Sequence, residues 1–333
     1  MDTFVKLPAD QRREICEQGF VKLNLSAASI EKDFWVCWSL RELFHLPVWG
    51  KQLTFKGGTS LSKGWRLISR FSEDIDIVIQ RDFLGFGDEG LTNKSRKKLL
   101  KECSRRIQKE LAPALEKHMK ESLPPDATWK LTPASLEEDP DQQTILFEYP
   151  AVFSNDLTYV RPLVKIELGA RSETEPVEMP VIQPYLAEAF PDLFKNSRFS
   201  IRTVAARRTF WEKAMLLHEE TFRPADKPRR VRLSRHYYDL WCLIRAGVAQ
   251  QAMDDTELFE RVARHRQIFF KQSWVDYKTL QKGSLRIAPR PQQLNEWRRD
   301  YDAMRKEMFF EEPPTFDEII KTVRLFEEEI NRS

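Results

Sequence analysis

The stretch LTFKGGTSLSKGWRLISRFSEDIDIVI, residues 53–79, decides how the rest of the chain is interpreted. It predicts a strand, a Gly-Gly turn, a helix, a short loop and a second strand. Gly57 and Gly58 have no Cβ atom, so the backbone N–H groups of this turn can approach a ligand closely. Thr59 or Ser60 then caps a helix whose first N–H groups form an anion site. Such a turn alone is a weak signal of a binding site, and the strand that follows strengthens it.

Two aspartates alternate with isoleucines in SEDIDIVI, the second strand of this stretch. Asp74 and Asp76 share one face of the strand, while Ile75 and Ile77 point the other way, into the core. Two carboxylates about 4 Å apart repel by roughly 4 kcal/mol at an effective dielectric constant of about 20. A divalent cation offsets this repulsion, and a site of oxygen ligands suits Mg²⁺ or Mn²⁺ together with substrate phosphates. The alternative is an exposed strand end or a loop.

A third carboxylate is expected on a later strand, VKIEL (164–168). The apolar residues of this segment alternate toward the core, so Lys165 and Glu167 share the opposite face. Glu167 is therefore the candidate for a third metal ligand beside Asp74 and Asp76. The alternative is a solvent-facing glutamate on an edge strand.

The 333 residues divide into three segments by their pattern. Residues 1–50 are expected to be helical, because apolar side chains recur near helical spacing in SIEKDFWVCWSLRELFHL and Ser29 can cap the helix. Residues 51–194 mix strands with one long helix, and residues 195–333 are helical again. The expected strands are 53–56, 75–79, 144–150 and 164–168, and the expected helices include about 92–120, 209–220, 236–248 and 257–270.

Composition excludes several classes of protein. The chain is 41% hydrophobic and 32% charged, which is apolar enough for a sizeable core. No run approaches the roughly 18 apolar residues of a membrane span, and the first residues lack the apolar core of a signal peptide. Four scattered cysteines without a CxxC pair, and five histidines without HExxH spacing, disfavour a disulfide scaffold and a zinc enzyme. We therefore expect a cytoplasmic protein without membrane contact.

Two basic runs stand out in a chain whose net charge is only +3. Residues 94–109 hold eight basic residues and one acid, and residues 223–235 hold six and one. Each run taken alone is a solvated surface as readily as a binding site, but the two together predict a polyanion site whose affinity falls with salt. The candidates for contact with nucleic acid are Lys94, Lys97, Lys98, Lys101, Arg105, Arg229, Arg230 and Arg232. Aromatic residues that would stack on bases, if they are not core, are Trp65, Trp211, Tyr237 and Tyr238.

The order of these motifs resembles the nucleotidyltransferase fold of the DNA polymerase β superfamily. FKGGTSLSK followed by RFSEDIDI resembles, more specifically, the AbiEii/AbiGii-type nucleotidyltransferase toxins, which include the MenT toxins of bacterial toxin–antitoxin and phage-defence systems. IEKDFWV (30–36), FWEKAMLLHEE (210–220) and RHYYDLWCL (235–243) are similar to further motifs of that family. The resemblance implies an α+β fold, with a small mixed sheet flanked by helices. It further implies an N-terminal helical segment (1–50), a nucleotidyltransferase core (51–194) and a helical C-terminal domain (195–333).

The resemblance also implies roles for individual residues. Asp74 and Asp76 would bind the metal ions, Lys213 would contact the triphosphate, and Asp239 would be the acid of the last motif, all four serving catalysis. The residues implied at the nucleotide are Gly57, Gly58, Thr59, Ser60 and Ser72, together with Lys213. A basic insert that contains proline, RPADKPRRVR, separates Lys213 from Asp239 and departs from the family pattern, which leaves the local geometry open.

The implied activity is transfer of a nucleotide from an NTP to an acceptor hydroxyl, with Mg²⁺ or Mn²⁺ as cofactor and pyrophosphate as product. The basic runs and the family favour the 3′ end of a tRNA as acceptor, so that aminoacylation, translation and growth would be blocked. An AbiEi-like antitoxin encoded nearby is the implied partner, without a commitment to a stable complex. Two alternatives stay open: an acceptor hydroxyl on a protein or small molecule, and a non-catalytic module that senses NTP or binds the antitoxin.

Overall fold

The structure is a computed structural model of the chain, and it describes residues 1–72, 74–87, 93–153, 161–309 and 311–332, with residues 93, 306 and 307 described by their backbone. The chain forms two compact units. The first comprises Met1–Gly64 and Ser72–Thr203, and the second comprises Trp65–Phe71 and Val204–Ser333. Residues 65–71, which lie between the predicted strands 53–56 and 75–79, therefore belong to the second unit.

The first unit is built on a mixed sheet of seven strands in the order β3-β4-β5-β2-β1-β9-β6. β2 runs parallel to β5 and antiparallel to β1, and β4 runs antiparallel to β5. The strands are β1 (Leu53–Lys56), β2 (Ile75–Ile79), β3 (Lys130–Pro133), β4 (Thr144–Glu148), β5 (Leu163–Gly169), β6 (Val177–Glu178) and β9 (Thr203–Val204). A separate two-stranded sheet pairs β7 (Val181–Ile182) with β8 (Phe199–Ser200). All four predicted strands are present, and β4 ends before Pro150, which has no N–H group to donate.

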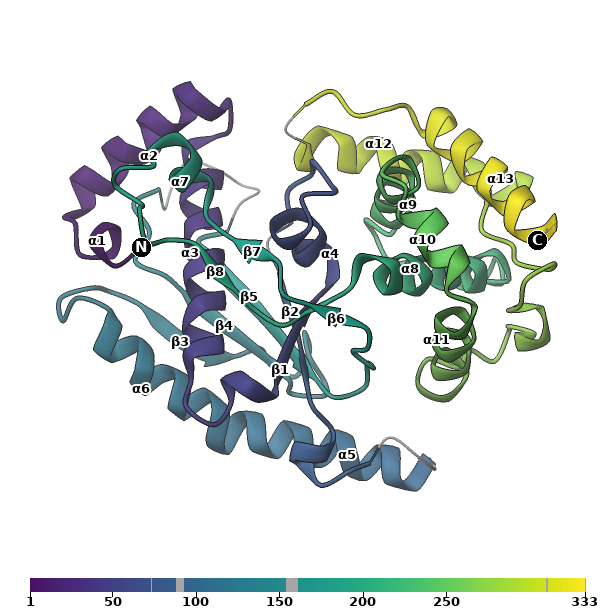
Figure 1. The fold of residues 1–333 in the computed structure, drawn as a ribbon, viewed down its shortest axis with the longest axis horizontal. Coiled ribbons are helices and arrows are strands. Elements are labelled where there is room, and N and C mark those ends of the chain that lie inside the picture. The colour runs from purple at the N-terminus through teal and green to yellow at the C-terminus, as the bar shows by residue number, and fades with distance from the viewer. Residues whose placement is uncertain (73, 88–92, 154–160, 310, 333) are drawn as a thin grey trace. The chain divides into compact units, whose positions relative to one another are not determined.

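One face of the sheet forms the core of the first unit. Ile75 lies opposite Ile166 in the register of β2 and β5, and both are fully buried. Helix α3 (Ala27–His45) packs on this face, where the rings of Trp35 and Trp38 lie 6.0 and 5.7 Å from the ring of Phe147 on β4 (Figure 1). The alternation predicted for the strands is confirmed, because Ile75 and Ile77 of β2 are buried in this core and Asp76 between them lies on the other face.

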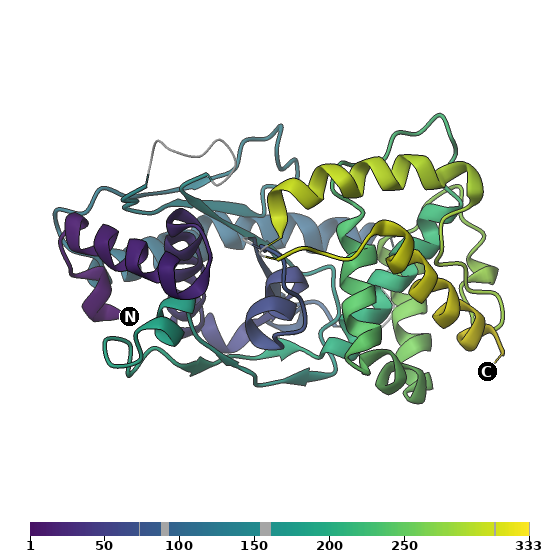
Figure 2. The same cartoon turned by 90° about the horizontal axis from the view of Figure 1, so that it is seen from above.

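The remaining helices of the first unit are α1 (Asp2–Val5), α2 (Ala9–Leu23), α4 (Gly57–Thr59), α5 (Asn93–Arg106), α6 (Ala112–Ser122) and α7 (Tyr185–Ala189). A π-helical turn, Ile107–Leu111, joins α5 and α6 into the long helix that was expected, seen as a continuous blue ribbon in Figures 1 and 2. The cap predicted for α3 is wrong by one turn. Its N-cap is Ser26, whose side chain accepts a hydrogen bond from the backbone N–H of Ser29.

The second unit is helical, whereas residues 195–203, which were expected to be helical, belong to the first unit and contain strand β8. Its helices are α8 (Ala206–Thr221), α9 (Arg235–Arg245), α10 (Val248–Asp254), α11 (Thr256–Phe269), α12 (Leu294–Met308) and α13 (Phe316–Arg332). The helix expected over 236–248 is two helices, because Gly247 takes a φ of +77° and ends the first of them. Taken over the described parts of the chain, no helix combines the length and the apolar character that crossing a membrane requires.

Three of the four aromatic residues considered for base stacking belong to the core of the second unit. Trp211 and Tyr237 are fully buried and Tyr238 nearly so, each in edge-to-face contact with another ring. Trp65 is half-buried, and its indole N–H donates to the carbonyl of Val204 at 3.2 Å. The stacking role considered for Trp211, Tyr237 and Tyr238 does not fit these positions, and their helical spacing reflects packing instead.

The buried His218 on α8 predicts that the protein loses stability in mild acid. Its Nδ1 accepts the backbone N–H of Arg286 at 3.0 Å, and its Nε2 lies 3.2 Å from the hydroxyl of Thr279. Burial, followed by the charges of Arg286 and Arg266, lowers the pKa of His218 to about 4. The unfolded chain therefore takes up a proton below about pH 6.5 that the folded protein refuses, which costs about 3 kcal/mol of stability by pH 4.

The measurement is the free energy of unfolding by urea at several pH values between 7 and 4. We expect His218→Gln, which keeps a hydrogen-bond acceptor, to flatten this part of the profile, and His45→Gln on the exposed end of α3 to leave it unchanged. An equally steep profile in the His218 variant would contradict the assignment.

Candidate active site

Two of the three predicted carboxylates, those of Asp76 and Glu167, lie on the face of the sheet opposite the core of the first unit. Asp76 of β2 is the register partner of Glu167 on β5, and on its other side it faces Lys56 of β1. Neighbouring strands lie about 4.8 Å apart, so these residues are direct neighbours. Asp74 directly precedes β2, at the end where that strand begins. The structure therefore places Asp76 beside Glu167 on two adjacent parallel strands, with Asp74 one residue before β2 begins.

A lysine supplies positive charge to this acidic face. Lys165 lies two residues before Glu167 on the same face of β5, and its ammonium group forms an ion pair with the Glu167 carboxylate. Partial burial disfavours the charged amine, but the hydrogen bond to Glu167 and the charges of Asp74 and Asp76 outweigh it and raise the pKa of Lys165. Within the described residues, no three acidic, His or Cys side chains converge closely enough to hold a metal ion. The Glu167 carboxylate is directed to Lys165 instead of completing such a set.

The Gly-Gly turn lies directly against the second aspartate. Gly57 takes a φ of +82°, and a Cβ added to it would lie 1.9 Å from Oδ2 of Asp76. No side chain fits there, because contacts under about 3 Å do not occur for real Cβ atoms. The antiparallel pairing of β1 with β2 causes this closeness, since Lys56, the residue before the turn, is the register partner of Asp76. The two most specific motifs of the sequence are thus in van der Waals contact.

The hydroxyl groups predicted at the nucleotide hold the turn in shape. Thr59 is fully buried, and its hydroxyl donates to the carbonyl of Asp74. Because that hydroxyl has a single proton, its bond of 2.9 Å with Ser72 must be donated by Ser72. The hydroxyl of Ser60 donates to the carbonyl of Gly57 at 2.8 Å. These bonds fasten α4 to the backbone that enters β2, a structural task that the sequence motif did not reveal.

The helix that follows the turn is shorter than expected. α4 covers Gly57–Thr59 and continues as a π-helical turn, Ser60–Gly64. Arg66 takes a φ of +54°, outside the helical region, and the chain then crosses the second unit before it returns at Ser72. Lys63, the last side chain of the turn, is buried and paired with Asp33 of α3.

The second unit brings Lys213 and Asp239 together, although the two residues were expected only to serve the same site. Lys213 of α8 lies 2.8 Å from Oδ2 of Asp239 on α9. Arg70 completes the cluster, because its guanidinium donates to both carboxylate oxygens of Asp239 at 2.7 and 2.8 Å. Sequence reasoning missed Arg70, whose only signal was its place in RFSEDID, four residues before Asp74. Bidentate pairing with a carboxylate is the geometry that arginine favours.

This cluster is buried and carries an excess of positive charge. Asp239 is fully buried; although desolvation opposes ionisation, Arg70 and Lys213 hold its pKa well below the ordinary value. Burial, despite the attraction of Asp239, lowers the pKa of Lys213, and the charges of Arg70 and Arg235 lower it further. Nδ1 of His236 lies 3.3 Å from the Lys213 ammonium, and burial lowers the pKa of this imidazole strongly. Two cations thus face one carboxylate, and a further anion would be stabilised beside them.

The carboxylates belong to the first unit and the Lys213 cluster to the second. Their convergence in one active site stays a prediction from the sequence motifs.

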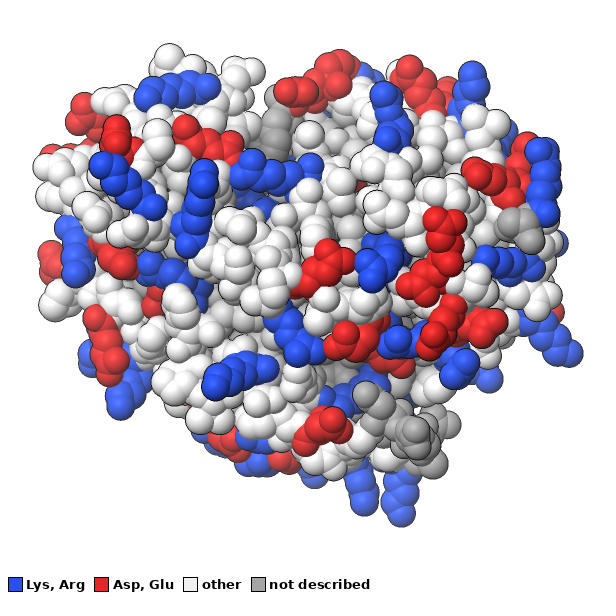
Figure 3. All heavy atoms as spheres, in the orientation of Figure 1, with Lys and Arg blue, Asp and Glu red and all other residues white. Residues whose placement is uncertain are grey.

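The two predicted basic runs differ in how their side chains are used. On α5, Lys94, Lys97, Lys98 and Lys101 are exposed along one side of the helix, and Arg105 is exposed but pairs with Glu102. On the face shown in Figure 3, basic side chains project from the lowest part of the view, and basic and acidic side chains are mixed over the rest of this face.

In the second unit, Arg230 and Arg232 are exposed, but Arg229 is not. Its side chain is 8% exposed and forms ion pairs with Glu220 and Glu296. It also lies over the ring of Trp297 at 4.7 Å. The contact with nucleic acid predicted for Arg229 does not fit this placement, because charge in a sequence run does not report which side chains are already paired.

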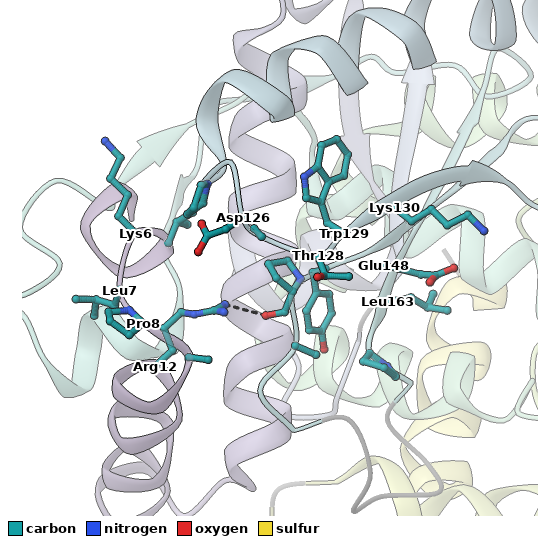
Figure 4. A pocket seen from close by; sticks show the side chains of 18 of the residues that line it. Lys6, Leu7, Pro8, Arg12, Asp126, Thr128, Trp129, Lys130, Glu148 and Leu163 are labelled. Carbon is teal, nitrogen blue, oxygen red and sulfur yellow. Dashed lines mark hydrogen bonds between the residues drawn. The ribbon is translucent and has the colours of Figure 1, made fainter.

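A cavity of about 1000 Å³ in the first unit was not anticipated from the sequence (Figure 4). The start of α2, the residues around Trp129, and the ends of β4 and β5 form its walls. Arg12 lies in its wall and donates to the carbonyl of Pro150 at 2.8 Å. Leu163, the first residue of β5, also lines the cavity, and Glu167 lies four residues further along, about 13 Å away for a strand. The cavity therefore borders the first residue of the strand that carries Glu167.

Comparison with solved structures finds the same architecture in a known toxin. MenT4, nucleotidyltransferase toxin Rv2826c from Mycobacterium tuberculosis H37Rv, matches with a TM-score of 0.50 and 16% identity, over 98% of this chain and 90% of that chain. At this identity the likeness shows the fold alone. JHP933 from Helicobacter pylori matches with a TM-score of 0.34 and 13% identity, over 88% of this chain and 89% of that chain, which is too weak to argue from. A search among curated proteins finds no match.

A family model gives the stronger result. The model described as "Nucleotidyl transferase AbiEii toxin, Type IV TA system" matches residues 38–322. The match includes the Gly57 turn, the acidic face and the Lys213–Asp239 pair, and it covers well over half of the chain. The predicted fold class is confirmed, and the chain belongs to the AbiEii family of nucleotidyltransferase toxins of type IV toxin–antitoxin systems.

Proposed function

We propose that this enzyme transfers a nucleoside monophosphate from an NTP to a hydroxyl group at the 3′ end of a tRNA, and thereby stops translation and growth. The observation that carries the proposal is the contact of the Asp76 carboxylate with the backbone of Gly57. It joins a turn suited to phosphate groups with a pair of carboxylates suited to a cation. The family supplies the reaction class, nucleotidyl transfer, and an antitoxin partner.

The donor set fits a divalent cation of the Mg²⁺ or Mn²⁺ type. Asp74 and Asp76 offer only oxygen ligands, and Mg²⁺ is commonly held by one or two carboxylates together with substrate phosphates. Glu167, the register partner of Asp76, would join them once its carboxylate leaves Lys165. When bound, such a cation neutralises charge on the phosphates and lowers the pKa of the attacking hydroxyl.

The residues of this chain then position the reactants and balance their charge. The backbone N–H groups of Gly58 and Thr59 would bind the phosphates, while the bonds of Thr59 and Ser72 keep the turn in place beside Asp74. The acceptor oxygen bonds to the α-phosphorus, the bond from that phosphorus to the bridging oxygen breaks, and pyrophosphate leaves with the electron pair. The hydroxyl proton passes to solvent. Lys213 and Arg70, with their excess positive charge, would offset the charge of the departing pyrophosphate.

Two features support an RNA acceptor. The exposed lysines along α5 present a row of point charges to a phosphate backbone. The cavity at the start of β5 is large enough for a nucleotide and lies along the strand that carries Glu167. We further propose an AbiEi-like antitoxin encoded nearby, a role in phage defence, and a cytoplasmic site of action. A protein acceptor, a small-molecule acceptor or a non-catalytic module would not explain the row of exposed lysines on α5.

Replacing both aspartates tests the reaction. We expect Asp74→Asn with Asp76→Asn to lower transfer by about 10³-fold or more, because the site then lacks the charge that offsets a divalent cation. The assay incubates the protein with each α-labelled NTP, Mg²⁺ and total tRNA, and follows label in the RNA. Asp82→Asn, an exposed aspartate just after β2, is the control that should keep activity. Toxicity in cells that survives the double change would mean that catalysis is not the function.

Charge reversal on α5 tests the acceptor. Lys97→Glu, Lys98→Glu and Lys101→Glu together should raise the KM for tRNA about tenfold or more and reduce its salt dependence, with NTP binding unchanged. Lys117→Glu with Lys120→Glu, exposed positions on α6, is the matched control. Equal KM values for tRNA in the two sets would favour a different acceptor.

Two substitutions in the buried cluster of the second unit distinguish a structural role from a catalytic one. Asp239→Asn leaves Arg70 and Lys213 without a carboxylate and should cost about 3–5 kcal/mol of stability. Lys213→Met keeps the Arg70–Asp239 pair, so its main expected effect is a loss of transfer rate, with a smaller loss of stability. Denaturant unfolding and steady-state kinetics measure both effects. A Lys213→Met protein with full activity would remove Lys213 from the proposed mechanism.

A further inference from the structure

The motif IEKDFWV contains three consecutive charged residues that are all buried in α3. Glu31 and Lys32 are 2% exposed and Asp33 is 5% exposed. Successive side chains on a helix point about 100° apart, so the three leave α3 in different directions. Charged side chains are rarely buried without partners, because desolvation is costly. Their partners therefore indicate what the motif does, and the proposed reaction does not use it.

Asp33 joins three segments of the first unit. One carboxylate oxygen forms an ion pair with Lys63, and the other accepts the backbone N–H of Tyr185 at 2.7 Å. Lys63 is 6% exposed, and its ammonium lies 3.2 Å from the centre of the Tyr185 ring. Burial alone would lower the pKa of Lys63, but the charge of Asp33 outweighs it and keeps the pKa above its ordinary value. The two side chains are thus paired with each other and sealed from solvent.

Lys63 belongs to the short helical segment that starts at the Gly-Gly turn. It lies in the π-helical turn Ser60–Gly64, which continues directly from Gly57–Thr59. At the start of this segment, Thr59 is bonded to the carbonyl of Asp74 and to Ser72. At its end, Lys63 is bonded to Asp33. A π-helical turn is rare and costs backbone regularity, so an anchor at each end fixes its position.

The two neighbouring charges hold a different part of the unit. Glu31 accepts the backbone N–H groups of Val152 and Phe153 at 2.9 and 3.3 Å. Lys32 donates to the carbonyl of Arg161 at 3.1 Å. Both serve segments that follow β4 or precede β5, away from the Gly-Gly turn in sequence. Lys32 is thus a buried lysine of the same motif that is bonded to the segment before β5.

We infer that Asp33 and Lys63 are positioning residues for the nucleotide: their buried ion pair fixes the Gly57–Gly58 turn against the start of β2. They touch no phosphate themselves, and they act through the backbone of residues 57–64. The identity of the ligand rests on the proposed function. The expected consequence is that loss of the pair loosens the turn and raises the KM for NTP more than it changes kcat, since a displacement of about 1 Å can cost up to about 10²-fold.

The decisive variant is the double change Asp33→Asn with Lys63→Met. It removes both charges together, so no unpaired charge stays buried, and the asparagine oxygen still accepts the N–H of Tyr185. We expect stability near that of the wild type, faster hydrogen exchange of the amides of residues 57–64, and a KM for NTP raised about tenfold or more. Lys63→Arg, which keeps the charge, should restore much of the affinity.

Lys32→Met is the matched control. It removes an equally buried lysine from the same helix, so it should cost stability and leave both the exchange of residues 57–64 and the KM for NTP unchanged. Unchanged exchange in the double variant, or faster exchange with unchanged KM, would overturn the inference. A wild-type protein that binds none of the four NTPs would overturn the proposed function, and the exchange rates would then still decide whether the pair anchors the turn.

Discussion

The contact between the carboxylate of Asp76 and the backbone of Gly57 is the constraint on which the site depends. Glycine is needed there twice, for its φ of +82° and for the space that a Cβ would take from Oδ2. The contact follows from the pairing of β1 with β2, which sets Lys56 opposite Asp76. A shift of one residue in that pairing would turn the aspartates into the core and the isoleucines outward. The proposed chemistry therefore depends on this one register of β1 with β2, because only this register places Asp76 beside Gly57 on the face opposite the core.

In both units, a buried aspartate holds several segments together through ion pairs and hydrogen bonds. In the first, Asp33 connects α3, the π-helical turn and α7. In the second, Asp239 connects α9 with α8 and with the segment that contains Arg70. Burying each of these aspartates costs desolvation free energy, and each carboxylate is bonded to several partners. Apolar packing of similar size would stabilise as well, so the charges are better explained by the specific geometry that they impose.

The regular parts of the fold were predictable because they rest on periodicity. The strands, the long helix over α5 and α6, and the position of Asp76 on the face opposite the core all follow from spacings of 2 or 3.6 residues. What could not be predicted rests on pairing over long distances in sequence. Arg70 meets Asp239 across 169 positions, and nothing near either residue indicates the other. Thr59 looked like a ligand because hydroxyls beside a glycine turn often are, whereas here its proton is directed to a backbone carbonyl.

The ion pair of Lys165 with Glu167 affects whether the sheet can form before a cation binds. An acidic surface of this kind would ordinarily resist closure of the sheet until a metal arrived to neutralise it. Here Lys165 supplies a counter-ion from within the chain, so β5 can pair with β2 without a bound cation. A divalent cation bound at this face would then compete with the Lys165 ammonium group for the Glu167 carboxylate.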